Sequence, residues 1–249
     1  RDQWFSEGLA NYCSLMMLQE TNPPGFREIL EKYQRDLLEK NKDGSVPKDA
    51  GPVTLGGRLL SSHFPGGYEA ISYGRGTWLF HMLRSMLQDA AAEEVSRSGR
   101  AGNPIDEPFV RALRKLRERY EGKAIGTREL LAVFAEELPP SLRYEDKPSL
   151  DWFLEGWVNG TSLPRLQLQG VKLAAKGSRM IATGMILQKE APDTLVTSVP
   201  IYAVVATGKA PVLMGRVFAD GPETSFRLTA PAGTHKLLLD PYRTVLAEK

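Results

Sequence analysis

The spacing of hydrophobic residues along the chain changes near residue 160. Before that point, apolar residues recur every three to four positions, which is the period of an amphipathic helix. After it, short runs of strand-forming residues alternate with turn residues. The pattern therefore predicts an α+β chain of two domains, a helical domain over residues 1–163 and a β-rich domain over residues 164–249.

Proline, glycine and asparagine divide the helical part. The Asn22-Pro23-Pro24 segment ends the first predicted helix. Residues 41–68 are rich in Gly, Pro, Asp and Ser, which predicts a long irregular crossing of the kind that is usually functional or disordered. Thr127 and Ser149 are expected as helix N-caps. The predicted helices cover residues 2–18, 26–38, 71–87, 106–121, 127–137 and 149–159, with an exposed loop at 96–103.

The β-rich part has turn clusters at regular intervals, such as Lys176-Gly177-Ser178 and Asp220-Gly221-Pro222. Short strands with turns at this spacing predict an immunoglobulin-like β-sandwich, without the cysteine pair and central tryptophan of antibody domains. The predicted strands cover residues 166–174, 180–188, 195–207, 211–219, 225–230 and 235–240.

Composition narrows the class of protein. The 249 residues are 42% hydrophobic and 25% charged, with a net charge of +2, which singles out neither nucleic acid nor a membrane surface as a partner. No uncharged apolar run approaches the roughly 18 residues that span a bilayer. The single cysteine, Cys13, cannot form an internal disulfide and is expected to be a packed thiol. Five cations between Arg111 and Arg119 are expected to form a solvated helix face.

Glu7 is the first candidate functional residue. At 100° per residue, the apolar stripe that includes Trp4 and Tyr12 lies roughly opposite Glu7, and no residue from Gly8 to Gln19 is charged. A helix that is apolar or small on every side is normally buried, so we expect Glu7 to be a carboxylate in the protein interior. Its partner would be a metal ion, a buried arginine or lysine, or the positive end of the helix dipole.

Tyr73 is the second candidate. It lies off the apolar stripe of the predicted third helix, near its start and beside Gly74 and Gly76. These glycines are poor helix formers, but they allow a backbone or a ligand to come close. A tyrosine hydroxyl in such a place can donate to a developing oxyanion. The alternative is a ring that fills a packing gap, with its hydroxyl bonded to a carbonyl.

The three histidines do not form a metal-binding motif. His63, His81 and His235 include no pair four residues apart, and H-E-x-x-H is absent. We expect His81 to be a packing residue within a helix and His235 to be structural, while His63 could reach a cleft from the glycine-rich crossing. The chain therefore holds no complete zinc site by itself.

Two segments follow the pattern of one enzyme family. Residues 2–12, DQWFSEGLANY, resemble the W-x-x-E-G-x-A-x-Y segment of the gluzincin aminopeptidases, the zinc family of aminopeptidase N and the leukotriene hydrolase–aminopeptidase. Residues 71–76, ISYGRG, are similar to the family's Tyr-x-Lys/Arg-Gly segment. Ser6 and Leu9 replace the commoner Asn and Phe. Residues 153–164 resemble the family's link into a β-sandwich, so the resemblance covers the whole chain.

The resemblance implies a fold and a chemistry. The helical part would be the second half of a zincin catalytic domain. In the family, two histidines of H-E-x-x-H and a glutamate on the next helix hold zinc, and Glu7 would be that third ligand. Tyr73 would stabilise the oxyanion that forms when water attacks the peptide carbonyl. The histidines, the general base and the acidic motif that grips the substrate amine would lie upstream.

We therefore expect the chain to be the C-terminal fragment of a zinc metallo-aminopeptidase, cytoplasmic or exported, which hydrolyses N-terminal residues of peptides. The fragment alone would be inactive and would not bind zinc tightly, because one carboxylate is not a four-coordinate site. Its partners would be the missing N-terminal half, peptide substrates of the whole enzyme and, in isolation, a second copy in a homodimer; no nucleic acid or membrane segment is expected.

Three alternatives remain open on the sequence. The chain could belong to a non-catalytic, scaffolding member of the family, or to a binding protein made of a helical domain and an immunoglobulin-like module. The family's epoxide-hydrolase side activity is the third.

Overall fold

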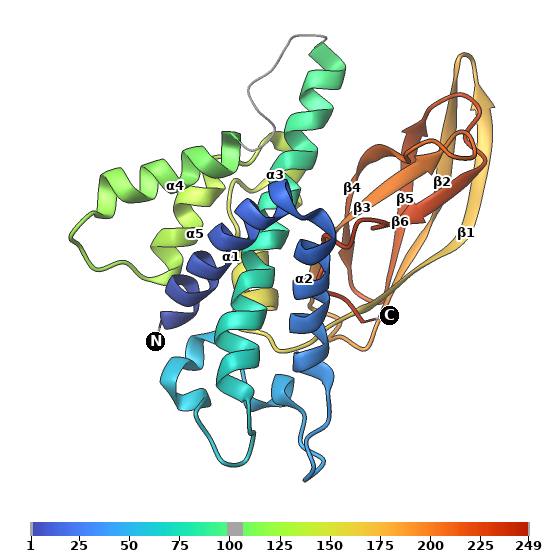
Figure 1. Ribbon diagram of the computed structural model, residues 1–249. Coiled ribbons are helices and arrows are strands. Elements are labelled where there is room, and N and C mark those ends of the chain that lie inside the picture. Colours follow the sequence, from blue (N-terminus) through green and yellow to red (C-terminus); the bar gives the residue numbers. More distant parts are fainter. Residues whose placement is uncertain (1, 99–106, 249) are drawn as a thin grey trace.

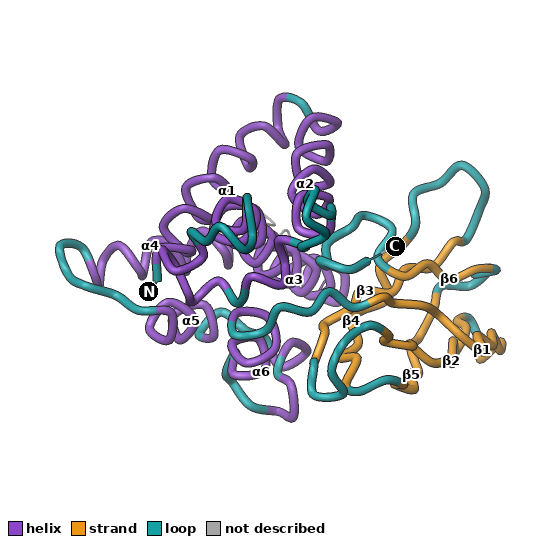
Figure 2. The backbone as a smooth tube through the Cα atoms, turned by 90° about the horizontal axis from the view of Figure 1, so that it is seen from below, coloured by secondary structure: helices purple, strands orange, loops and turns teal. Residues whose placement is uncertain are grey.

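The computed structural model describes residues 2–98 and 107–248. Helices occupy the first two-thirds of the chain and strands the last third, which confirms the predicted α+β class. Helices lie on one side of the molecule and two β-sheets on the other (Figure 1), and the view from below shows the same division (Figure 2).

Most of the predicted helices are present, with shifted ends. The predicted loop at 96–103 lies mainly outside the described residues, and residues 96–98 continue a helix. The helices are α1 (Gln3–Thr21), α2 (Pro23–Leu38), the π-helix η3 (Glu69–Arg75), α3 (Gly76–Ser98), α4 (Glu107–Tyr120), α5 (Thr127–Ala135), α6 (Asp151–Phe153) and the π-helix η6 (Leu154–Val158), with short 3-10 helices η1 (Pro47–Ala50), η2 (Val53–Leu59), η4 (Pro140–Leu142) and η5 (Tyr144–Asp146).

A proline pair separates α1 from α2, as predicted. Asn22 caps α2, because its side-chain oxygen accepts a hydrogen bond from the Gly25 N–H at 3.1 Å. Proline is tolerated at the first helical positions, where the N–H would have no partner within the helix. The two helices turn back on each other and both contact η3, which is the element that carries Tyr73.

Both predicted N-caps are wrong. Gly126, not Thr127, precedes α5. The Thr127 hydroxyl is instead buried in a tertiary contact, where it accepts from the Trp4 indole at 3.0 Å and donates to Asp2 at 2.6 Å. Leu150 has the N-cap position of α6, and Ser149 makes no cap hydrogen bond there.

The crossing at residues 41–68 is less irregular than predicted. It contains η1 and η2, and Val53 and Leu59 are buried with the helical core. The predicted third helix also differs, because its first five residues, 71–75, belong to the π-helix η3, and α3 begins only at Gly76.

The six predicted strands are all present and form two antiparallel three-stranded sheets, in the orders β1-β2-β5 and β4-β3-β6. Apolar side chains from both sheets share one buried core, which includes Ile186, Val199 and Phe226. The strands are β1 (Arg165–Lys176), β2 (Arg179–Lys189), β3 (Val196–Val204), β4 (Val212–Asp220), β5 (Glu223–Ala230) and β6 (Lys236–Leu239).

Buried polar contacts join the sheets to the helices. Arg216 on β4 forms an ion pair with Asp89 on α3, and its guanidinium also donates to the hydroxyl and carbonyl oxygens of Ser198. The Trp157 indole on η6 donates to the Val196 carbonyl at 2.9 Å. Within residues 2–98 and 107–248, no helix is long and apolar enough to cross a membrane.

Candidate functional site

The two candidate residues, Glu7 and Tyr73, lie next to each other on neighbouring elements. Helix α1 crosses the junction of η3 and α3 where Gly8 meets Gly76. A Cβ on Gly8 would lie 2.6 Å from the carbonyl carbon of Gly76, and a Cβ on Gly76 would lie 2.9 Å from the carbonyl oxygen of Trp4. The two backbones are therefore in direct contact, which only glycine permits. This crossing of the two backbones places Glu7 and Tyr73 close to each other.

The Glu7 carboxylate affects the ionisation of Tyr73. A hydrogen bond with the Glu7 carboxylate is the largest cause that raises the pKa of the Tyr73 hydroxyl, and partial burial adds to it. The pKa rises because the ionised phenol could no longer donate and would face a carboxylate. Tyr73 is therefore a protonated hydrogen-bond donor at neutral pH.

Tyr73 lies in the π-helix η3. In a π-helix the hydrogen bonds join residues five apart, and such turns are frequent at functional sites. Tyr68, five residues before Tyr73, packs edge-on against the Tyr73 ring with centroids 5.9 Å apart and an angle of 76° between the rings. Tyr68, the N-cap residue of η3, thus packs directly against the Tyr73 ring.

The prediction that Glu7 lies in the protein interior is wrong. Glu7 is partly buried, and one face of α1 is open to solvent, with Met17 70% exposed. The exposed face of α1 carries no charge from Gln3 to Met17, where it consists of Gln3, Ser6, Ala10, Cys13, Ser14 and Met17, and the exposed Glu20 follows at its C-terminal end. The uncharged segment from Gly8 to Gln19 is therefore partly exposed to solvent in this chain, and Glu7 lies beside the exposed face.

The surroundings of Glu7 leave its charge available. Among the described residues, no arginine or lysine forms an ion pair with the Glu7 carboxylate. The buried salt bridge, one of the partners weighed from the sequence, is therefore absent from the described part of the chain, and Glu7 lies beyond the first turn of α1, where the helix dipole would favour a carboxylate.

Sequence reasoning missed Tyr33 and Asn11. The Asn11 side-chain amide on α1 donates to the Tyr33 hydroxyl on α2 at 3.1 Å. Tyr33 also lies against Gly74, where an added Cβ would be 3.4 Å from the Tyr33 Cβ. These contacts hold α1, α2 and η3 together beside Glu7. The glycine at 74 was the available signal, but it does not identify the neighbour.

His81 is a packing residue, as predicted. Its ring is buried among Phe26, Trp78 and Tyr12, and its nitrogens contact the Tyr12 hydroxyl at 3.2 Å and the Arg243 carbonyl at 3.3 Å. Burial lowers the pKa of His81 to about 4, because the charged imidazolium would lose its hydration.

The remaining metal-ligand types are dispersed. His63 and His235 are exposed, and Cys13 is exposed as well, which corrects the prediction of a packed thiol. In the part of the chain that the structure describes, no group of three or more His, Cys, Asp or Glu side chains could hold a metal ion.

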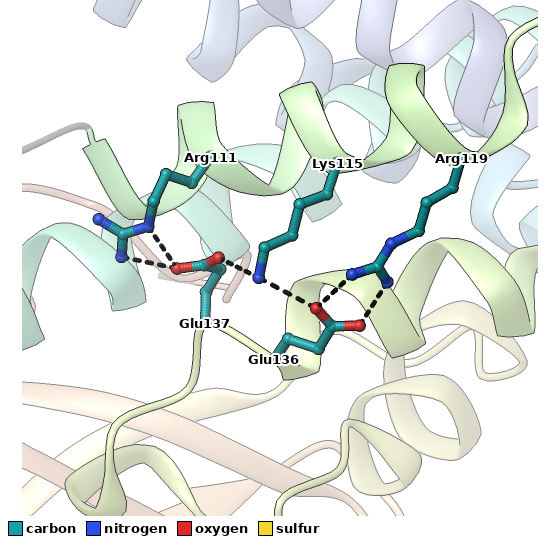
Figure 3. Close-up of polar contacts among 5 residues, drawn as sticks. All are labelled: Arg111, Lys115, Arg119, Glu136 and Glu137. Carbon is teal, nitrogen blue, oxygen red and sulfur yellow. Dashed lines mark hydrogen bonds and ion pairs between the residues drawn. The ribbon is translucent and has the colours of Figure 1, made fainter.

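The basic face of α4 was predicted to be solvated, but three of its cations form ion pairs with neighbouring carboxylates. Arg111, Lys115 and Arg119 lie on one side of the helix and pair with Glu136 and Glu137 at the end of α5 (Figure 3). The Arg119 and Lys115 side chains lower the pKa of Glu136 to about 2, because they stabilise its ionised form. This part of the surface is a network of opposite charges that joins α4 to α5.

No protein-family model and no curated protein matches the chain. The site is therefore defined by its own chemistry: a carboxylate without a cationic partner among the described residues, a protonated phenol whose pKa that carboxylate raises, and an open helix face beside them that is uncharged as far as Met17. Such a pair can contribute an oxygen ligand to a metal and a donor to a developing negative charge.

Proposed function

We propose that this chain supplies two functional groups of a zinc aminopeptidase, with Glu7 as a zinc ligand and Tyr73 as the hydrogen-bond donor to the oxyanion. The observation that carries the proposal is the contact of Glu7 with Tyr73 at the Gly8–Gly76 crossing. Peptide hydrolysis of this kind needs a metal ligand and an oxyanion donor around one scissile carbonyl. Residues 66 positions apart in the chain meet here in that combination.

Glu7 fits a zinc ion as one ligand of several. Carboxylate oxygen is one of the donor types that zinc accepts, and no arginine or lysine of the described part competes for Glu7. One carboxylate does not complete a site, and the sequence has no H-E-x-x-H, so the other ligands would come from a segment outside this sequence. When bound, zinc polarises the carbonyl and activates water.

The exposed face of α1 offers a place for that segment. Its residues are small or uncharged, so a second helix can approach closely, and Glu7 lies at the edge of the face. A helix packed on this face would bring its own side chains beside Glu7 and Tyr73. Covering the face would also exclude water and strengthen every electrostatic interaction in the site.

The chain's own residues then have distinct roles. Glu7 would hold the metal, and Tyr73 remains protonated because its pKa is raised, so its hydroxyl could donate to the negative oxygen of the tetrahedral intermediate. The substrates would be peptides with a free N-terminus.

The proposal includes a finer fold assignment. Residues 1–163 would be the helical half of a zincin catalytic domain and residues 164–249 an immunoglobulin-like β-sandwich. Two three-stranded antiparallel sheets around one shared core support the second part.

The test uses the full-length protein that contains this chain. Its zinc content is measured by mass spectrometry, and its activity is measured on an amino-acid p-nitroanilide and on the N-acetylated form. We expect bound zinc, hydrolysis of the free-amine substrate alone, and loss of activity with a chelator that zinc reverses. A zinc-free protein that hydrolyses neither substrate would overturn the proposal in favour of a binding protein.

A further inference from the structure

Arg75 is a buried cation that has no acidic partner within residues 2–98 and 107–248. Its side chain is 1% exposed, and no carboxylate of the described residues pairs with it. Burial lowers its pKa to about 10, so the guanidinium is still charged at neutral pH. A buried charge is costly unless hydrogen bonds compensate it, so the position of Arg75 needs a reason.

The compensation comes from carbonyl groups at the end of η6. The Arg75 Nη2 donates to the Trp157 carbonyl and Nη1 donates to the Thr161 carbonyl, both at 3.0 Å, and Nε reaches Trp157 at 3.4 Å. Carbonyls at a helix C-terminus lack partners within the helix and carry the negative end of its dipole. The fork of the guanidinium therefore joins η3 to the end of η6.

Arg75 holds the turn that carries Tyr73. Gly76, the next residue, fixes the place of this turn against α1, and Arg75 fixes its rotation against η6. The Trp157 indole in turn donates to the Val196 carbonyl of β3, so the residue that anchors Arg75 is itself tied to the sheet. A π-helix is rarer than an α-helix and needs such support from its surroundings. If η3 relaxed to an α-helix, Tyr73 would rotate relative to Glu7.

We propose that Arg75 is a positioning residue, which keeps Tyr73 against Glu7 by tying the π-helical turn of η3 to the carbonyls of Trp157 and Thr161. The catalytic meaning of this role rests on the proposed function, but the contact of Tyr73 with Glu7 is testable in the chain without zinc or substrate.

The experiment is fluorine NMR of the 249-residue chain labelled with 3-fluorotyrosine at its eight tyrosines. Tyr73→Phe assigns the Tyr73 signal, and Glu7→Gln calibrates its shift when the contact is weakened. We expect Arg75→Lys, which keeps the charge but loses the fork, to move the Tyr73 signal as far as Glu7→Gln does. The matched control is Arg84→Lys, a change at another buried arginine of the next helix, which should leave the Tyr73 signal in place.

A second variant covers the case in which Arg75→Lys does not fold. A Cβ at Gly160 would overlap the carbonyl oxygen of Gly156, so Gly160→Ala displaces the turn that presents the Thr161 carbonyl. The Tyr73 signal should shift in this variant as well. An unmoved Tyr73 signal in a folded Arg75→Lys or Gly160→Ala chain would overturn the positioning role. Absence of peptidase activity in the full-length protein would overturn only the proposed function.

Discussion

The close crossing of α1 with the η3–α3 junction predicts a large effect of a very small substitution, Gly8→Ala. The added Cβ would lie 2.6 Å from the Gly76 carbonyl carbon, whereas ordinary contact begins at 3.4 Å. Both partners are backbone atoms inside helices, so no side chain can move away, and the elements must separate. Overpacking of this kind costs up to about 3 kcal/mol, and the gain in helix propensity returns about 1 kcal/mol.

The expected net loss is about 2 kcal/mol, which lowers Tm by roughly 4–8 °C in a chain of this size. Thermal unfolding followed by circular dichroism measures it. The matched control is Gly57→Ala, because a Cβ there would meet only the Gln3 side chain, at 3.9 Å. It should leave Tm unchanged or slightly raised. A Gly8→Ala chain as stable as the Gly57→Ala chain would refute the backbone contact, and with it the reason why Glu7 meets Tyr73.

Three further predictions concern charges away from this crossing. Burial lowers the pKa of His81 from 6.5 to about 4, so as the pH falls the unfolded chain binds a proton at His81 before the folded chain does. The free energy of unfolding should therefore fall by about 3 kcal/mol as the pH is lowered through this range. Urea unfolding at several pH values should show this loss in wild type and not in His81→Gln; equal pH profiles would contradict it. Asp89→Asn leaves Arg216 buried without its carboxylate and should cost about 3–5 kcal/mol in urea unfolding, a prediction that an unchanged midpoint would refute. Changing Glu136 and Glu137 to Gln frees the cations of α4, so the double variant should elute from heparin at higher salt than wild type, and elution at the same salt would show that the network does not neutralise them.

The elements of the fold could be predicted where local pattern decides them. The six strands and the Asn22-Pro23-Pro24 break were found because alternation and turn residues act over a few positions. The cap at Thr127 was missed because its hydroxyl is used by Trp4 and Asp2, partners that a local cap rule does not consider. The π-helix was missed because nothing in the residues of η3 distinguishes it from an α-helix; its support comes from distant backbone.

The sequence selected Glu7 and Tyr73 as candidate residues, and their roles stay predictions, whereas the surroundings of Glu7 could not be predicted. Spacing and residue type selected Glu7 and Tyr73, and the structure brings them together. The burial of Glu7 was predicted wrongly. A helix face without charges can be covered by another element, but the pattern does not show whether such an element is present. The importance of Arg75 was not visible, because its partners are carbonyl groups that any residue carries.

The comparison of Glu7→Gln with Tyr73→Phe in the full-length protein tests the central claim most directly. With zinc content and turnover measured on both, Glu7→Gln should lose zinc and activity together. Tyr73→Phe should keep its zinc and lose about 10²–10³-fold in kcat, the size expected for one oxyanion donor. Full zinc and full turnover in Glu7→Gln, or unchanged turnover in Tyr73→Phe, would contradict the roles assigned to these two side chains.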